Sequence, residues 1–235
     1  MDERILVVDD DREIVGAIAI LLEREGYQVL RAYNGMEALE QAVDPALRLI
    51  LMDVMMPRLD GLSAVLRIRE KRNLPIIVLS ARSEETDKIL GLSVGADDYV
   101  TKPFSPPELV ARVRSQLRRY TSLGDVHAEG RLDVIVNGRL TYDPEGMCLK
   151  ADGEPVKLTA TETRIVDLLM RNLGRIFPAE EIYRRVWDGE AAYACENTVM
   201  VHIRRIREKI ELNPREPDYI KVVWGIGYKM EQHGT

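Results

Sequence analysis

The sequence predicts two domains of different class: an α/β domain built on a doubly wound five-stranded parallel sheet, and a smaller α+β domain after it. The chain has 235 residues, which is more than the ~150 of an average domain. Apolar runs alternate with helical patterns over residues 1–120, whereas hairpin signals and three helical patterns occupy residues 132–231. Residues 121–131 are polar and lack periodicity, which is typical of a linker.

The strands expected in the first domain are short continuous apolar runs. They occupy residues 5–8, 28–32, 47–52, 76–79 and 99–100. Such runs are typical of strands that are buried on both faces of a parallel sheet. The segments between them carry apolar residues at helical spacing, so that strand and helix alternate five times. This alternation predicts the doubly wound α/β fold.

The second domain begins with hairpin signals. Asn137-Gly138, Glu145-Gly146 and Asp152-Gly153 interrupt alternating apolar stretches, which predicts a small antiparallel sheet. Helical patterns follow, the second of which starts at Pro178, a residue favoured in the first turn of a helix. The chain then carries a glycine-tipped hairpin at residues 220–230.

Composition excludes several classes of protein. Hydrophobic residues make up 46% of the chain and charged residues 31%, which is enough apolar material for a core. No apolar run reaches the ~18 residues of a membrane helix, and the charged N-terminus predicts a strand rather than a signal peptide. Cys148 and Cys195 form no metal cluster or disulfide framework, so we expect free thiols in the cytoplasm. With a net charge of −6, any surface that binds DNA must be local.

Charged and hydroxyl side chains follow the predicted strands of the first domain. Asp9 and Asp10 follow the first strand, Asp53 the third, Ser80 the fourth and Lys102 the fifth. Ligands bind at the carboxyl ends of parallel strands, so we expect these side chains to converge. Clustered carboxylates repel one another unless a cation lies among them, and their oxygens suit Mg²⁺. A carboxylate beside a metal ion and a lysine can attack a phosphoryl group.

The alternative is that acidic residues at strand ends cap the helices that follow. We favour this interpretation for Asp11 and Asp60. It is weak for the four residues Asp9, Asp10, Asp53 and Lys102, since four such positions at strand ends rarely coincide by chance.

Four motifs resemble those of bacterial response-regulator receiver domains: ILVVDD (5–10), MDVMMPRLDG (52–61), LSA (79–81) and DDYVTKPF (97–104). The resemblance implies a flavodoxin-like fold in which Asp53 accepts a phosphoryl group from a sensor histidine kinase. It further implies that Asp10, Asp53 and the carbonyl of Met55 bind Mg²⁺, with Asp9 acting partly through water.

The same resemblance assigns roles to three further residues. Ser80 and Lys102 would contact the phosphoryl oxygens, and Tyr99 would move inward with Ser80 as a switch pair. The resemblance also implies a cis peptide between Lys102 and Pro103, a type of bond in which the cis form is tolerated.

One helix of the second domain combines an apolar stripe with a basic face. Arg204, Arg205, Arg207 and Lys209 lie opposite the stripe, an arrangement that suits the DNA major groove. The alternative is a solvated face with ion pairs such as Arg204–Glu208. His202 is expected to face the groove or to pack rather than bind metal, since no second His or Cys lies at ligand spacing.

Motifs in the second domain resemble the winged-helix effector of the OmpR/PhoB subfamily. They are LTATE (158–162), the segment 175–187, VMVHIRRIR (199–207) and GIGY (225–228). The resemblance implies binding to double-stranded promoter DNA, and contact with RNA polymerase through residues 188–198. The expected DNA contacts are His202, Arg204, Arg205 and Arg207 in the major groove, with Lys221 and Trp224 of the wing in the minor groove.

Some residues depart from the subfamily pattern. Trp224 stands where the wing often has Arg, so its indole either packs on sugars or joins the core beside Tyr228. Asn197 and Met200 also differ, which makes contacts there doubtful. Gln116 stands where Arg usually pairs with Asp97 across a dimer.

The resemblance also implies a dimer and a function. Lys88, Asp98, Glu108 and Arg112 match residues that form salt bridges across the active dimer. The sequence therefore predicts a transcription regulator rather than an enzyme: phosphorylation at Asp53 adds charge and drives homodimerisation.

Three other classes remain as alternatives. An aspartyl-phosphate phosphatase needs a second Asp two residues after the nucleophile, where this chain has Met55. A nucleotide-binding oxidoreductase needs a Gly-x-Gly-x-x-Gly motif where this chain has three aspartates. An output domain that binds protein rather than DNA would show no salt-dependent retention on DNA.

Overall fold

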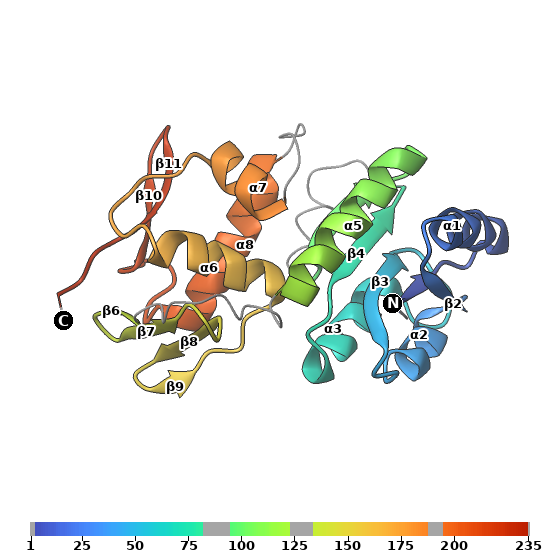
Figure 1. Cartoon of the computed structure of the whole chain (residues 1–235), viewed down its shortest axis with the longest axis horizontal. Coiled ribbons are helices and arrows are strands. Elements are labelled where there is room, and N and C mark those ends of the chain that lie inside the picture. Colours follow the sequence, from blue (N-terminus) through green and yellow to red (C-terminus); the bar gives the residue numbers. More distant parts are fainter. Residues whose placement is uncertain (1–2, 82–94, 123–133, 188–194, 235) are drawn as a thin grey trace. The chain divides into compact units, whose positions relative to one another are not determined.

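The computed structural model describes residues 3–81, 95–122, 134–187 and 195–234. The chain divides into two compact units, residues 1–120 and 121–235. Figure 1 shows a sheet flanked by helices in the first unit, and three helices with two antiparallel sheets in the second. The predicted linker at 121–131 lies almost entirely outside the described residues. None of the helices that the structure describes is long and apolar enough to cross a membrane.

The first unit is a five-stranded parallel sheet with strand order β2-β1-β3-β4-β5, which confirms the doubly wound fold. The reversal of strand order places the carboxyl ends of β1 and β3 side by side. The strands are β1 (Arg4–Val8), β2 (Gln28–Ala32), β3 (Leu47–Asp53), β4 (Ile76–Ser80) and β5 (Asp98–Thr101). The described helices are α1 (Arg12–Arg24), α2 (Gly35–Gln41), α3 (Gly61–Lys71) and α5 (Pro106–Ser122).

Short polar side chains start the helices of this unit. Asp11 accepts hydrogen bonds from the amides of Glu13 and Ile14, at 2.8 and 3.3 Å, and begins α1. Asp60 accepts from the amide of Ser63 at 2.9 Å and begins α3. These bonds satisfy amides that lack partners in the first turn of a helix. The capping interpretation of Asp11 and Asp60 is confirmed.

The core of the first unit lies on both faces of the sheet. Residues 5–8 are completely buried, as the continuous apolar run predicts. One core cluster joins β1, β3, β4 and β5 to the apolar faces of α1 and α5. Each fully buried aliphatic side chain contributes ~1.5–3 kcal/mol, so this packing fixes the strand ends at which the charged residues lie.

The second unit is a winged-helix domain. An antiparallel sheet in the order β6-β7-β8-β9 precedes three helices, and a hairpin, the wing, follows them. The first sheet contains β6 (Ile135–Asn137), β7 (Leu140–Asp143), β8 (Cys148–Ala151) and β9 (Glu154–Pro155). The helices are α6 (Ala160–Met170), α7 (Ala179–Trp187) and α8 (Cys195–Ile210). The wing consists of β10 (Ile220–Val223) and β11 (Gly227–Met230).

The apolar stripe of α8 is confirmed. Val199, Ile203, Ile206 and Ile210 are all at most 1% exposed and belong to the core cluster of the second unit. The wing joins this core where Phe177 and Tyr228 exchange backbone hydrogen bonds of 2.8 and 2.9 Å. The two backbone segments approach so closely here that a Cβ on Gly227 would lie 2.1 Å from the Phe177 carbonyl oxygen. Glycine at this position thus holds the wing against the helices.

Candidate functional site

Three carboxylates converge at the carboxyl edge of the parallel sheet. Asp9 and Asp10 follow β1, and Asp53 ends β3. One oxygen from each of the three lies within 4.8 Å of the others. Asp9 and Asp53 are 1% and 4% exposed, whereas Asp10 is exposed. The predicted convergence is confirmed, and Asp10 is the member of the cluster that faces solvent.

Lys102 bridges the two buried carboxylates. Its Nζ lies 2.5 Å from Oδ2 of Asp9 and 2.6 Å from Oδ1 of Asp53. Burial raises the pKa of the Asp53 carboxyl, against the opposing hydrogen bond and charge of Lys102. Burial acts to lower the pKa of Lys102, but the bonds and charges of the two carboxylates outweigh it, and the pKa is raised. The charged ammonium group of Lys102 is therefore held between the buried carboxylates of Asp9 and Asp53.

The loop after β3 is held tightly around Asp53. The amide of Met55 donates to Oδ2 of Asp53 at 2.7 Å, and the amide of Gly61 donates to the Val54 carbonyl at 3.0 Å. A Cβ on Gly61 would lie 1.8 Å from the Asp53 carbonyl oxygen. The role of the Met55 carbonyl as a metal ligand stays a prediction.

Ser80 and Tyr99 lie on the neighbouring strands. Ser80 ends β4 and is 1% exposed, and Tyr99 on β5 is 8% exposed. The amide of Lys102 donates to the Ser80 carbonyl at 2.7 Å. The peptide between Lys102 and Pro103 is cis, which confirms that expectation. The switch role of Ser80 and Tyr99 stays a prediction.

This arrangement suits phosphoryl chemistry. Oxygen atoms of Asp9, Asp10 and Asp53 match the ligand type that hard divalent cations prefer, so the cluster is compatible with a bound divalent metal. A buried carboxylate beside a metal position and an ammonium group is the constellation in which a carboxylate can accept a phosphoryl group.

The basic face of α8 divides into exposed and buried cations. The side chain of Arg204 is 75% exposed and forms a 3.1 Å ion pair with Glu208, which is the pair expected for a solvated face. The Arg205 side chain is only 12% exposed, because its guanidinium forms a 3.1 Å ion pair with buried Glu162. Lys209 approaches the same carboxylate at 2.5 Å. Arg205 is therefore engaged within the domain, and its predicted DNA contact stays a prediction.

His202 is buried in the domain, and Arg207 is bonded to the wing. His202 is completely buried, and its ring lies 5.3 Å from the ring of Trp187, so the packing alternative holds and the DNA contact is wrong. Arg207 donates from Nε and Nη2 to the carbonyl of Ile220, at 3.0 and 2.7 Å. Burial lowers the pKa of Arg207. This guanidinium fastens α8 to the wing.

The wing exposes apolar side chains. Trp224 is 88% exposed and Ile226 56%, so the alternative that Trp224 joins the core beside Tyr228 is wrong. Lys221 is partly exposed, with its Nζ 3.7 Å from Asp218. Both side chains at the tip of the wing therefore lie outside the core and are accessible to a partner.

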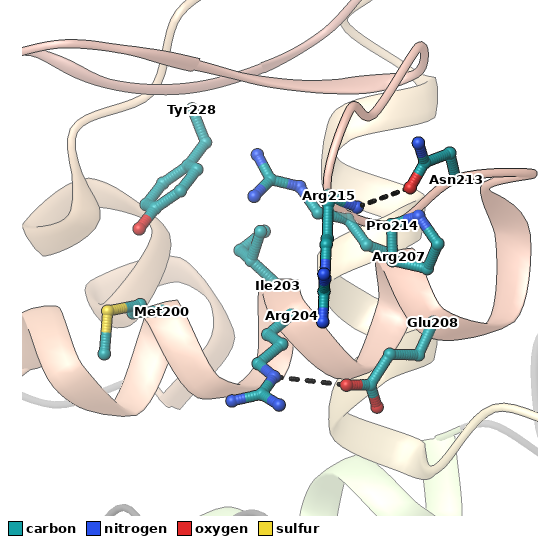
Figure 2. Close-up of a pocket in the computed structure, with 9 residues that line it drawn as sticks. All are labelled: Met200, Ile203, Arg204, Arg207, Glu208, Asn213, Pro214, Arg215 and Tyr228. Atoms are coloured by element: carbon teal, nitrogen blue, oxygen red, sulfur yellow. Dashed lines mark hydrogen bonds and ion pairs between the residues drawn. The ribbon is translucent and has the colours of Figure 1, made fainter.

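A cavity of about 620 Å³ lies between α8 and the wing (Figure 2). Its lining includes Arg215 and Tyr228, which the sequence analysis did not assign to DNA. Arg215 lies on the loop after α8 and Tyr228 on β11, so neither shares the helical spacing that marked the basic face. The only sequence signal for Tyr228 is its place in the GIGY motif.

The residues expected at a dimer interface pair within the chain. Arg112 donates to Asp98 at 2.9 Å and to Glu108 at 3.1 Å. Asp97 is buried and forms a 2.5 Å ion pair with Arg69 of α3. Lys88 lies outside the described residues.

Gln116, which stands where the resemblance implies an Arg at a dimer interface, is buried. It is 1% exposed on α5, and Asp97 already has a partner in Arg69. Asp97 is therefore paired within the chain although position 116 lacks the usual Arg.

Comparison with known families agrees with this geometry. Residues 5–114 match the model of the response regulator receiver domain. Residues 153–230 match the model of the C-terminal domain of transcriptional regulatory proteins. The two matches fall in the two compact units.

Relatives of similar length exist. An uncharacterized transcriptional regulatory protein, YrkP of Bacillus subtilis, is 45% identical over 97% of this chain and 98% of its own. The regulatory protein VanR of Enterococcus faecium is 40% identical over 99% of this chain and 100% of its own.

Solved structures are similar along almost the whole chain. A response regulator described as an OmpR/PhoB homolog, DrrB of Thermotoga maritima, has 31% identity and a TM-score of 0.50, covering 98% of this chain and 100% of its own. A RitR variant has 27% identity and a TM-score of 0.75, covering 99% and 100%. With these relatives, the receiver site and the winged helix, the chain belongs to the two-component response regulators of the OmpR/PhoB subfamily, which regulate transcription by binding DNA.

Proposed function

We propose that Asp53 is the phosphoacceptor and that its donor is a sensor histidine kinase. The observation that carries this proposal is the bridge of Lys102 between buried Asp53 and Asp9. In the transfer, a carboxylate oxygen of Asp53 bonds to phosphorus as the bond between phosphorus and the kinase histidine breaks. Lys102 then has phosphoryl oxygens as partners, and Ser80 can donate to another of them.

The acidic cluster would bind Mg²⁺ through Asp9, Asp10, Asp53 and the carbonyl of Met55. The ion, when bound, neutralises charge between the carboxylates and the incoming phosphoryl group. Asp10 is the exposed member of the cluster, which gives an ion access from solvent. In this scheme the chain accepts a phosphoryl group and transmits a signal, rather than turning over a substrate as an enzyme.

An apolar groove beside the acidic cluster is the proposed docking surface for the kinase. It has a volume of about 640 Å³ and is lined by residues of α1 and of the segment after β5, including Ile14, Ile20, Phe104 and Lys102. Ile20 is 52% exposed. A partner that delivers a phosphoryl group to Asp53 must lie beside Lys102, and Lys102 forms part of the groove wall.

Phosphorylation would then promote dimerisation. The phosphoryl group adds about −1.5 to −2 charge, which draws Lys102 and Ser80 and biases the position of Tyr99. The charged residues Asp98, Glu108 and Arg112 with Lys88 would form the interface between two copies of the chain. The present partners of Asp98, Glu108 and Arg112 lie within one chain, so dimerisation would exchange these pairs for pairs between chains.

The second unit would bind double-stranded promoter DNA with α8 in the major groove and the wing in the minor groove. Arg204 is the most exposed of the predicted contacts on α8, and Trp224 the most exposed on the wing. RNA polymerase would meet residues 188–198, most of which lie outside the described residues. The protein would act in the cytoplasm, where kinase, polymerase and DNA meet.

One experiment tests the link between phosphorylation of Asp53 and DNA binding. A duplex selected by the protein from a random-sequence pool is titrated before and after treatment with Mg²⁺ and acetyl phosphate. We expect the phosphodonor to raise affinity for the wild type and to leave Asp53→Asn unchanged. An equal rise in Asp53→Asn would contradict the assignment of Asp53.

A further inference from the structure

The cavity between α8 and the wing is lined by cations. Arg204 and Arg207 come from α8, and Arg215 comes from the loop between α8 and β10. The lining has three arginines and one glutamate, which leaves a net charge of +2. Glu208 already pairs with Arg204. A cavity with this excess of guanidinium groups suits an anion that accepts several hydrogen bonds.

Arg215 has a fixed backbone and an available side chain. Its amide donates to Oδ1 of Asn213 at 3.2 Å, and Nδ2 of Asn213 donates to Glu216 at 3.2 Å, so the turn is held by its own side chains. Within the described part of the chain, the Arg215 guanidinium has no hydrogen bond or ion pair. Figure 2 shows the Arg215 side chain extending from this loop toward α8. The guanidinium is thus positioned without being neutralised.

The other groups of the cavity are oriented by the fold. The hydrogen bonds from Arg207 to the Ile220 carbonyl fix its guanidinium at the base of the wing. Figure 2 shows the Tyr228 hydroxyl pointing toward α8 near Met200. Burial raises the pKa of this hydroxyl, which keeps it protonated and able to donate.

The position of the cavity identifies its occupant. In a DNA duplex, one sugar–phosphate strand separates the major groove from the adjacent minor groove. A domain with a helix in one groove and a hairpin in the next must have that strand between them. The cavity lies between α8 and β11, which are those two elements.

We propose that this cavity binds a phosphate group of the DNA backbone, and that Arg215 is a phosphate ligand supplied from outside both the helix and the wing. The proposal rests on the placement of α8 and the wing proposed above. A phosphate between Arg204, Arg207 and Arg215 would fix the register of the domain on DNA and add affinity that does not depend on sequence.

Salt-dependent binding of the full chain tests this. Each phosphate contact contributes ~0.9 to the slope of log K against log salt concentration. We expect Arg215→Ala to lower the slope by about one unit, and to weaken binding equally on a selected duplex and on an unrelated one. The matched control is Lys150→Ala, which removes the same charge from an exposed position on β8 and should keep the wild-type slope.

Phosphate ethylation interference locates the contact. In the selected duplex, Arg215→Ala should lose interference at one phosphate per half-site, on the strand between the two grooves. A wild-type slope and an unchanged interference pattern in Arg215→Ala would overturn the proposal. Inorganic phosphate, titrated at constant ionic strength, gives a second arm. If it binds through Arg215 while the DNA slope is unchanged, the cavity belongs to a small phosphorylated ligand and the DNA assignment is overturned.

The two proposals fail in different ways. If the wild type shows no salt-dependent binding to any duplex, the placement of α8 and the wing on DNA is wrong. If Arg204→Ala weakens DNA binding but Arg215→Ala does not, only the assignment of the cavity is wrong.

Discussion

Arg205 of helix α8 forms an ion pair with Glu162 of helix α6, with 3.1 Å between Nη2 and Oε1. Glu162 is completely buried, and its Oε2 also accepts from the amide of Thr159 at 2.8 Å as part of a capping box. Lys209 of α8 donates to the same oxygen at 2.5 Å. One carboxylate therefore both begins α6 and anchors α8 through two cations.

Arg205→Ala should destabilise the second unit. Glu162 would lose one of two cationic partners in a buried site, which costs ~1–3 kcal/mol. The two tryptophans of the chain, Trp187 and Trp224, both lie in this unit. Urea unfolding followed by tryptophan fluorescence therefore reports its stability, and we expect a lower midpoint.

Arg204→Ala is the matched control for this substitution. Its exposed pair with Glu208 is worth only ~0.3–0.5 kcal/mol, so the midpoint should hardly change while DNA affinity falls. If Arg205→Ala keeps the wild-type midpoint but binds DNA more weakly, Arg205 contacts DNA after all.

Gly61→Ala should disturb the loop that holds Asp53. The added Cβ would lie 1.8 Å from the backbone oxygen of Asp53, and overpacking of this kind costs ~1–3 kcal/mol or more. We expect a lower unfolding midpoint of the first unit by circular dichroism and slower phosphorylation. Gly16→Ala in α1 is the control, since nothing lies within 4 Å of its Cβ and alanine stabilises a helix by ~0.5–1 kcal/mol.

Labelling should depend on Asp53 and on a divalent metal. With acetyl phosphate, Asp53→Asn should show no phosphorylation on a phosphate-affinity gel, and a chelator should abolish labelling of the wild type. Asp10→Ala should lose labelling as well, because metal binding is impaired. Asp11→Asn is the control: asparagine also caps helices, so labelling should persist. Labelling of Asp53→Asn at the wild-type rate would place the acceptor elsewhere.

Trp224→Arg should strengthen DNA binding. An exposed indole has no charge with which to sense the negative potential of the minor groove, whereas a guanidinium does. We expect the salt slope to steepen by about one unit, with no change in stability, because Trp224 is 88% exposed. Titrations at several salt concentrations give the slope. An unchanged slope would leave the wing's electrostatic role to Lys221.

Arg112→Glu should weaken the phosphorylated dimer. It reverses the charge that now pairs with Asp98 and Glu108. Exposed pairs at an interface contribute only ~0.2–1 kcal/mol each, so the dissociation constant should rise by no more than about fivefold per pair. Sedimentation of the phosphorylated chain measures this. Arg114→Glu is the control on the same helix, since Arg114 pairs with Glu25 instead. A dimer unaffected by Arg112→Glu would indicate a different interface.

The strands and the acidic cluster were predictable because they depend on local pattern. A continuous apolar run requires burial on both faces, and the carboxyl ends of parallel strands meet at one edge. Asp9, Asp53 and Lys102 thus came together as expected. The bridging position of Lys102 between two carboxylates could not be predicted, since strand order alone does not fix where a side chain lies.

The DNA face was less predictable. Helical spacing separates the apolar stripe of α8 from its cations, but it does not show which cations meet a buried carboxylate. Glu162 lies on another helix, and its pairing with Arg205 depends on how α6 packs against α8. Arg215 was not predicted as a DNA contact for a similar reason: the loop that bears it lies beside α8 only in the folded domain.

The two hydrophobic cores described above have no residue in common: one is built from residues 5–117 and the other from residues 135–230. Each unit that the structure describes therefore has a core of its own. We expect a signal-receiving half of this kind to be portable, because joining it to a different output would leave the packing of both cores unchanged. Exchange of whole domains between regulators, by recombination or by engineering, then alters which genes respond while the chemistry of reception stays intact.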